Sequence, residues 1–140
     1  MNANTETKLI YTGRNHTTGG RDGGTSRSDD GRLDIKLSTP GTGTGTNPEQ
    51  LLAAGWSACF IGAMRLAAAP LKVRVPNDVA VDAEIDLIQR ADGYFLQARL
   101  HVSLPGLDRD VAQTLAETAH RTCPYSKALT GNIDIAIDVV

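Results

Sequence analysis

Two cysteines are the residues of this chain best suited to chemistry, and they lie in contrasting surroundings. Cys59 is in the apolar run AAGWSACFIGAM, whereas Cys123 is in the polar stretch HRTCPYS, directly before a proline. Two such thiols can be separate packing residues, a structural disulfide, a metal pair or the two halves of a redox reaction. The residues around them have to distinguish between these four roles.

A metal site has little support from the spacing of ligand-type residues. The two cysteines are 64 positions apart, and neither belongs to a Cys-x-x-Cys pair. His16, His101 and His120 follow no ligand spacing either, and zinc sites normally show such pairs. We therefore expect no metal and no other bound cofactor.

The cellular compartment expected for the protein helps to decide whether a disulfide would be structural or catalytic. The start of the sequence, MNANTETKLIYTG, lacks the basic and apolar regions of a secretory signal, so we expect a cytoplasmic protein. In that compartment a disulfide is more often transient and catalytic than structural. Two unrelated buried thiols remain the plain alternative, because free cysteine is among the most buried residue types.

A reactive Cys59 needs a positive charge from elsewhere in the chain. Its expected neighbours are apolar and disfavour a thiolate: Trp56, Phe60 and Met64. Arg21, in the segment TGGRDGG, is a candidate for that charge because the glycines around it let the backbone approach closely. A solvated loop arginine is the usual alternative.

Glu49 raises a geometric point. It stands at the second position of a predicted helix, where a carboxylate suits the helix dipole. If that helix is continuous, Glu49 and Cys59 are about 15 Å apart along its axis and cannot share a site within one chain. They could share one across a two-fold axis, if the same helix of a second chain ran antiparallel beside the first. The sequence thus suggests an intertwined dimer.

This helix is the central element of the predicted fold. Asn47 can cap it, Pro48 suits its first position, and we expect it to end near Pro70. The segment from Leu51 to Ala69 is long enough to cross a bilayer. It is nevertheless rich in Ala and Gly, and it carries Arg65, so we expect a helix buried on nearly all sides instead.

The remaining elements predict an α+β fold. Alternating apolar and polar residues predict strands at 8–17, 33–38, 79–88 and 94–104, and another in the closing IDIAIDVV. The link RADGY between 79–88 and 94–104 contains the Asp-Gly turn of a hairpin. A helical pattern covers 108–122, and a short turn or helix follows Cys123. We expect a single domain over residues 1–140, with antiparallel strands packed on the apolar helix.

The bulk composition is that of a globular protein with a small ligand. Hydrophobic residues make up 41% and charged residues 21% of the chain. With 14 basic and 16 acidic side chains, the net charge of -2 gives no electrostatic basis for binding nucleic acid or a membrane surface.

Four segments together resemble a known family. TGGRDG, GTNPEQLLAAGWSACFIGA, AHRTCPYS and GNIDI occur in the same order as in the organic hydroperoxide resistance proteins of the OsmC/Ohr superfamily. The similarity is collinear over essentially the whole chain. Trp56 stands where the resemblance leads us to expect tyrosine, and KALT departs from the family pattern before GNI. These departures bear on substrate preference.

The resemblance implies a fold and an activity. The fold would be an OsmC/Ohr-like α+β structure, with antiparallel sheets around a central buried apolar helix, assembled as an intertwined homodimer. The activity would be that of a peroxidase in the oxidative stress response, which reduces alkyl and fatty-acid hydroperoxides to alcohols. Its reductant would be a dihydrolipoyl-bearing protein or dihydrolipoamide.

The resemblance also implies roles for individual residues. Cys59 is similar to the peroxidatic thiol and Cys123 to the resolving thiol, and the two would form an intramolecular disulfide. Arg21 is similar to the cation that stabilises the thiolate, and Glu49 to the carboxylate that orients this arginine. An apolar wall would accept the alkyl tail, formed by Trp56, Phe60, Met64 and Tyr125. A redox sensor or lipoyl-binding module without turnover is the alternative.

Overall fold

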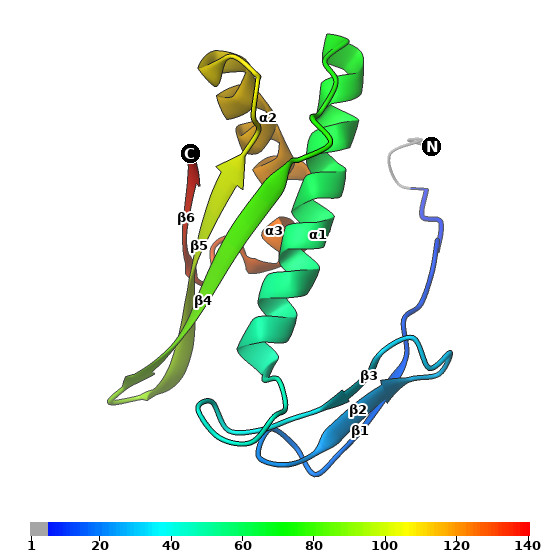
Figure 1. The fold of residues 1–140 in the computed structure, drawn as a ribbon, viewed down its shortest axis with the longest axis vertical. Coiled ribbons are helices and arrows are strands. Elements are labelled where there is room, and N and C mark those ends of the chain that lie inside the picture. Colours follow the sequence, from blue (N-terminus) through cyan, green and yellow to red (C-terminus); the bar gives the residue numbers. More distant parts are fainter. Residues whose placement is uncertain (1–5) are drawn as a thin grey trace. The chain divides into compact units, whose positions relative to one another are not determined.

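The computed structural model describes residues 6–140 and divides the chain into two compact units, residues 1–47 and 48–140 (Figure 1). Unit 1 contains a three-stranded antiparallel sheet of order β1-β2-β3, made of Asn15–Thr18, Thr25–Ser28 and Asp34–Lys36. The single domain predicted over residues 1–140 stays a prediction.

The sheet of unit 1 differs in two respects from the prediction. The first strand begins only at Asn15, and β2 lies within a stretch predicted to be a loop. The sequence of β2, TSRS, has no apolar residue to mark its inward face. Its inward residue is instead Ser26, which is 7% exposed and bonds through its hydroxyl to Asn15 Nδ2 at 3.2 Å and Thr17 Oγ1 at 2.9 Å. Hydrogen bonds between small polar side chains thus replace the apolar packing on which the prediction of strands from alternating residues depends.

Unit 2 contains the long helix, a second sheet and two shorter helices (Figure 1). In chain order its elements are α1 (Pro48–Ala68), the 3-10 turn η2 (Ala69–Leu71), β4 (Ala80–Arg90), β5 (Gly93–Ser103), α2 (Arg109–Thr122), α3 (Pro124–Leu129) and β6 (Asp134–Val139). The predicted start of α1 at Pro48 and its end near Pro70 are confirmed, as is the helix over 108–122.

The sheet of unit 2 has the order β4-β5-β6 and is mixed. β4 and β5 form the expected antiparallel hairpin, whereas β6 pairs parallel with β5. The expectation of purely antiparallel sheets is therefore wrong for this pair. After β5 the chain passes through α2 and α3 and returns to the end of the sheet where β5 begins. β6 therefore runs in the same direction as β5, as is usual when a helical crossover joins two neighbouring strands.

One apolar core holds unit 2 together. It combines residues of α1, β5 and α2, of which the largest fully buried ones are Trp56, Phe60, Met64, Leu100, Val102 and Leu115. The inward residues of β5 alternate with polar ones, so α1 and α2 cover the same face of the sheet. The predicted α+β architecture of sheet and central helix is confirmed.

The burial of α1 is one-sided. Its buried residues form a single stripe, made of Trp56, Phe60, Ala63, Met64 and Ala68. The expectation of a helix buried on nearly all sides is thus wrong for the single chain. The segment Pro48–Leu71 is long and apolar enough to cross a membrane by length and composition, and 28% of its most apolar window is buried. A core helix of a soluble protein meets the same criterion.

The other face of the second sheet carries a network of charged side chains. His101 lies between two carboxylates, with Nε2 at 2.6 Å from Glu84 and Nδ1 at 2.6 Å from Asp138. Arg99 donates two hydrogen bonds to Asp86, at 2.7 and 2.9 Å. Hydrogen bonds from Arg99 lower the pKa of Asp86 to about 2, and those to Glu84 and Asp138 raise the pKa of His101 above its ordinary 6.5.

The raised pKa of His101 predicts a pH-dependent contribution to stability. The protonated ring stabilises the folded state below its ordinary pKa, and this contribution is lost as the pH rises through the folded-state value. Thermal unfolding should therefore show wild type more stable than His101→Gln near pH 6, with the difference shrinking towards pH 9. The matched control is His16→Gln in unit 1. A difference that is the same at both pH values would contradict the prediction.

Candidate active site

Cys123 lies at a sharp junction between two helices. It is at once the C-terminal cap of α2 and the N-terminal cap of α3, with no linker between them. Its N–H donates to the carbonyl of Ala119 at 2.7 Å, and its carbonyl accepts from the N–H of Lys127 at 2.9 Å. Pro124 explains the break, because proline disfavours a helical residue before it and suits the first position of a new helix. The junction leaves the Cys123 side chain fully buried.

The structure brings the two cysteines together. Cys59, on α1, is partly exposed, and Cys123 lies close enough to it to raise its pKa. The backbone N–H of Tyr125 also donates to the Cys59 sulfur. The Tyr125 ring lies against Gly55, where a Cβ atom would be 2.8 Å from the tyrosine hydroxyl. Glycine at this position therefore allows the start of α3 to lie close to α1.

The surroundings of Cys59 favour the neutral thiol. Burial raises the pKa of Cys59 above its ordinary value, and the hydrogen bond to Cys123 raises it further, while the N–H of Tyr125 lowers it. Burial also lowers the pKa of His120, one turn before Cys123 on α2, so this histidine is mostly neutral at pH 7. An ionised Cys59 therefore needs a cation other than His120.

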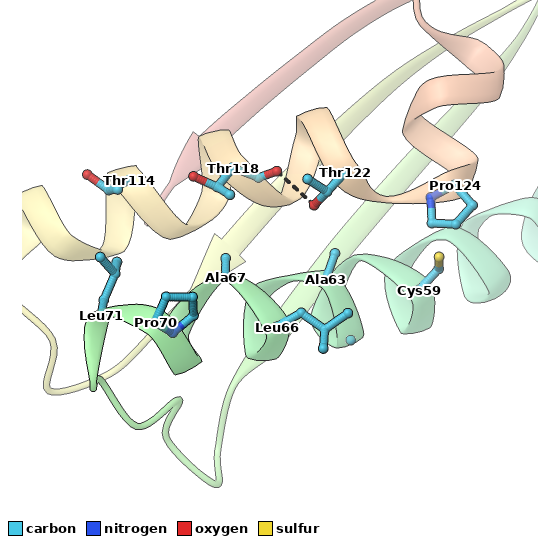
Figure 2. A pocket seen from close by; sticks show the side chains of 11 residues that line it. Cys59, Ala63, Leu66, Ala67, Pro70, Leu71, Thr114, Thr118, Thr122 and Pro124 are labelled. Atoms are coloured by element: carbon cyan, nitrogen blue, oxygen red, sulfur yellow. Dashed lines mark hydrogen bonds between the residues drawn. The ribbon is translucent and has the colours of Figure 1, made fainter. Parts of the chain in front are cut away.

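An apolar groove of about 860 Å³ begins at Cys59 and runs between α1 and α2 (Figure 2). Cys59 and Pro124 lie at one end of it, and Pro70, Leu71 and Thr114 lie at the other (Figure 2). The threonines of α2 contribute little polarity to its wall, because their hydroxyls are occupied within the helix. The Thr122 hydroxyl, for example, donates to the carbonyl of Thr118 at 2.9 Å.

The groove is lined by residues that were not singled out from the sequence. On α1 and η2 they are Gly62, Ala63, Leu66, Ala67, Pro70 and Leu71, and on α2 they are Thr114, Thr118 and Thr122. Most of the first set follow Cys59 by three, four, seven, eight or eleven residues, the spacing of one helix face. That spacing, counted from the cysteine, could have identified them.

The four predicted pocket residues have different environments. Trp56, Phe60 and Met64 are each 0% exposed and belong to the core of unit 2, on a stripe of α1 beside the groove. Tyr125 is 41% exposed. Trp56 donates a hydrogen bond from Nε1 to the hydroxyl of Ser126 at 3.0 Å. A role in substrate binding stays a prediction for all four.

Arg21 lies in the turn between β1 and β2 of unit 1. The turn closes on itself, since the N–H of Gly24 donates to the carbonyl of Gly20 at 3.0 Å. A Cβ atom at Gly24 would be 2.2 Å from the carbonyl oxygen of Thr18, so only glycine fits there. The glycines of this segment thus produce a compact turn around Arg21.

Glu49 lies in the first turn of α1. The helix is continuous from Pro48 to Ala68, so Glu49 and Cys59 are about 15 Å apart along its axis. Within one chain, the structure therefore brings Cys59 and Cys123 together and keeps Glu49 away from Cys59.

Comparisons with known proteins agree with this geometry. Residues 41–138 match the family model of OsmC-like proteins. The organic hydroperoxide resistance protein of Xanthomonas axonopodis pv. citri is 45% identical over 135 residues, which cover 93% of this chain and 94% of that protein. The crystal structure of the organic hydroperoxide resistance protein OhrB of Bacillus subtilis is 37% identical, with a TM-score of 0.88, and the match covers 94% of this chain and 100% of that one.

A second solved structure gives the same result. It is an organic hydroperoxide resistance protein from Elizabethkingia anophelis, 37% identical with a TM-score of 0.86, matched over 95% of this chain and 98% of that one. The chain therefore belongs to the OsmC-like family and, within it, to the organic hydroperoxide resistance proteins. The resemblance drawn from the sequence is confirmed.

Proposed function

We propose that this chain is a thiol-dependent peroxidase that reduces organic hydroperoxides to alcohols. The observation that carries the proposal is the meeting of Cys59 and Cys123, 64 positions apart in the sequence, at one end of an apolar groove. The names of the relatives supply the class of substrate, the organic hydroperoxides.

The first step is attack by Cys59. Its thiolate attacks the distal oxygen of the hydroperoxide, the O–O bond breaks, and the alkoxide leaves as an alcohol after it takes up a proton. Cys59 becomes a sulfenic acid. The partly exposed Cys59, at the end of the groove, suits this role better than the fully buried Cys123.

The second step is resolution by Cys123. Its thiol condenses with the sulfenic acid of Cys59, which forms the disulfide and releases water. A dithiol then reduces the disulfide by exchange and is itself oxidised to a cyclic disulfide. We propose a dihydrolipoyl group, free or carried on a protein, as this reductant, and a cytoplasmic location, where reducing equivalents keep the cycle running.

The groove explains a preference for organic over hydrogen peroxide. An alkyl or fatty-acyl tail laid along α1 and α2 would bury apolar surface against Ala63, Leu66 and Ala67. Hydrogen peroxide has no tail and gains nothing from this wall. The apolar lining thus contributes binding energy to bulky substrates only.

Arg21 is our candidate for the cation that the thiolate of Cys59 requires. A guanidinium beside the sulfur would offset the burial that raises the pKa of Cys59. It could also donate a hydrogen bond to the departing oxygen. We propose that Glu49 orients this guanidinium.

A homodimer would bring Glu49 of one chain to Cys59 of the other. If two α1 helices lay antiparallel, residues 49 and 59 would face each other across a two-fold axis near residue 54. Ala54, Ala58 and Gly62 form an exposed row of small residues on α1, and a Cβ atom at Gly62 would meet nothing within 4 Å. Such a row permits close approach of two helices. These features support a dimer with two sites.

Turnover tests the proposed function. With dihydrolipoamide as reductant, the reduced protein should consume cumene and fatty-acid hydroperoxides over many cycles, and hydrogen peroxide more slowly because it lacks a tail. Cys59→Ser should abolish consumption, since no other thiol is placed to react first. Steady-state rates with the three peroxides measure this. If one equivalent reacts and consumption then stops, a redox sensor is the correct function.

Arg21→Ala tests the source of the positive charge. Loss of the guanidinium should raise the apparent pKa of Cys59 by about one unit or more, measured from the rate of alkylation by iodoacetamide as a function of pH. Arg27→Ala on β2 is a matched control, because it removes an exposed arginine from the same unit. An unchanged profile in Arg21→Ala would remove Arg21 from the mechanism.

Complementation between two variant chains tests the shared site. Glu49→Ala should lower activity, and Cys59→Ser should abolish it. If Glu49 serves the Cys59 of the other chain, co-expression of the two variants should restore about one quarter of the wild-type activity, because half of the dimers carry one intact site. Purified dimers mixed without exchange serve as the control. No restoration in co-expressed heterodimers would contradict a site shared between chains.

A further inference from the structure

The hydrogen bond between Trp56 and Ser126 is not used by the mechanism above. Indole Nε1 donates to the serine hydroxyl at 3.0 Å, and both side chains are 0% exposed. A buried indole N–H can only donate, and leaving it unpaired is unfavourable. Trp56 has no exposed surface in this chain, so its indole N–H depends on Ser126 for a partner.

The position of this bond relates it to the two thiols. Trp56 precedes Cys59 by three residues, about one turn of α1, and Ser126 follows Cys123 by three residues on α3. The bond therefore joins the helix that carries Cys59 to the short helix that begins directly after Cys123. It lies one turn away from each sulfur, on the buried side of the site.

Two further contacts between these two helices involve a reacting atom or an exposed ring. The N–H of Tyr125 donates to the Cys59 sulfur, which changes its bonding when it is oxidised. The Tyr125 ring over Gly55 is 41% exposed. In contrast, neither Trp56 nor Ser126 changes its covalent state during a thiol–peroxide cycle, so their bond can persist through every step.

Resting on the proposed function, we propose that Trp56 and Ser126 are positioning residues for the resolving step. Their hydrogen bond holds the start of α3 against α1, so that the sulfur of Cys123 stays within reach of Cys59 after its oxidation. The step that depends on it is condensation of the Cys59 sulfenic acid with the Cys123 thiol, in which an S–S bond forms and water leaves. A disulfide requires the two Cα atoms to lie within about 7 Å, which makes this step sensitive to displacement of α3.

Ser126→Ala tests the proposal, because it removes the acceptor and leaves the backbone of α3 unchanged. The reduced protein is mixed with less than one equivalent of cumene hydroperoxide, without reductant, and quenched at successive times. Loss of peroxide measures the first step. Mass spectrometry of the trapped sulfenic acid and of the disulfide measures the second. We expect the first rate to remain within twofold of wild type and disulfide formation to be slower by roughly three- to tenfold.

A matched control, a second single variant and a double variant make the test specific. Ser57→Ala removes a hydroxyl that donates only within α1, to the carbonyl of Ala53 at 2.7 Å, and should change neither rate. Trp56→Phe removes the donor and should slow the second step as Ser126→Ala does. It provides the same test if Ser126→Ala fails to fold. The double variant should be no slower than the slower single variant, because both lose the same bond.

The outcomes separate this proposal from the proposed function. Disulfide formation at the wild-type rate in both single variants would overturn the positioning role, and so would equal slowing of both steps, which indicates a general structural effect. Additive effects in the double variant would also overturn it. If wild type itself does not consume the peroxide, the peroxidase function fails; oxidation of the same variants by diamide then still measures whether the bond promotes disulfide formation.

Discussion

The contact between Cys59 and Cys123 is the constraint on which unit 2 depends. The fold has to bring the middle of a long helix against a residue 64 positions later. It does so by breaking a helix at Pro124, without a linker, so that α2 packs into the core while α3 turns back onto α1. The same break directs the chain into β6, alongside β5. A continuous helix through Cys123 would remove both the thiol contact and the parallel strand.

Burying the two thiols disfavours the thiolate of Cys59, and the groups of unit 2 described above offset this effect only in part. Burial raises the pKa of Cys59, and the N–H of Tyr125 offsets this in part. His120 adds little positive charge, because burial lowers its own pKa. Unit 2 thus provides the two thiols and the groove, and the cation proposed above for the thiolate, Arg21, belongs to the glycine-rich turn of unit 1.

Sequence patterns predicted those features that depend on neighbours along the chain. The helix boundaries and the β4–β5 hairpin follow from capping residues, alternation and an Asp-Gly turn, all local signals. The parallel pairing of β6 and the polar strand β2 were missed because tertiary crossover and hydroxyl contacts determine them. The thiol contact could be inferred only by family resemblance. The residues that line the groove were not identified from the sequence, because many of them are small residues such as Ala63 and Ala67, which give no strong apolar signal.

The low content of polar residues in α1 follows from the number of its faces that contact other groups. A helix of a soluble protein ordinarily has one apolar face and one polar face. On α1, one row of residues that includes Trp56 packs in the core, and a second row that begins at Cys59 lines the groove. The exposed row that contains Ala58 and Gly62 is the face proposed for a second chain. A helix with three such faces has almost no room for polar residues, which explains why it meets the composition criterion for a membrane span without requiring a membrane.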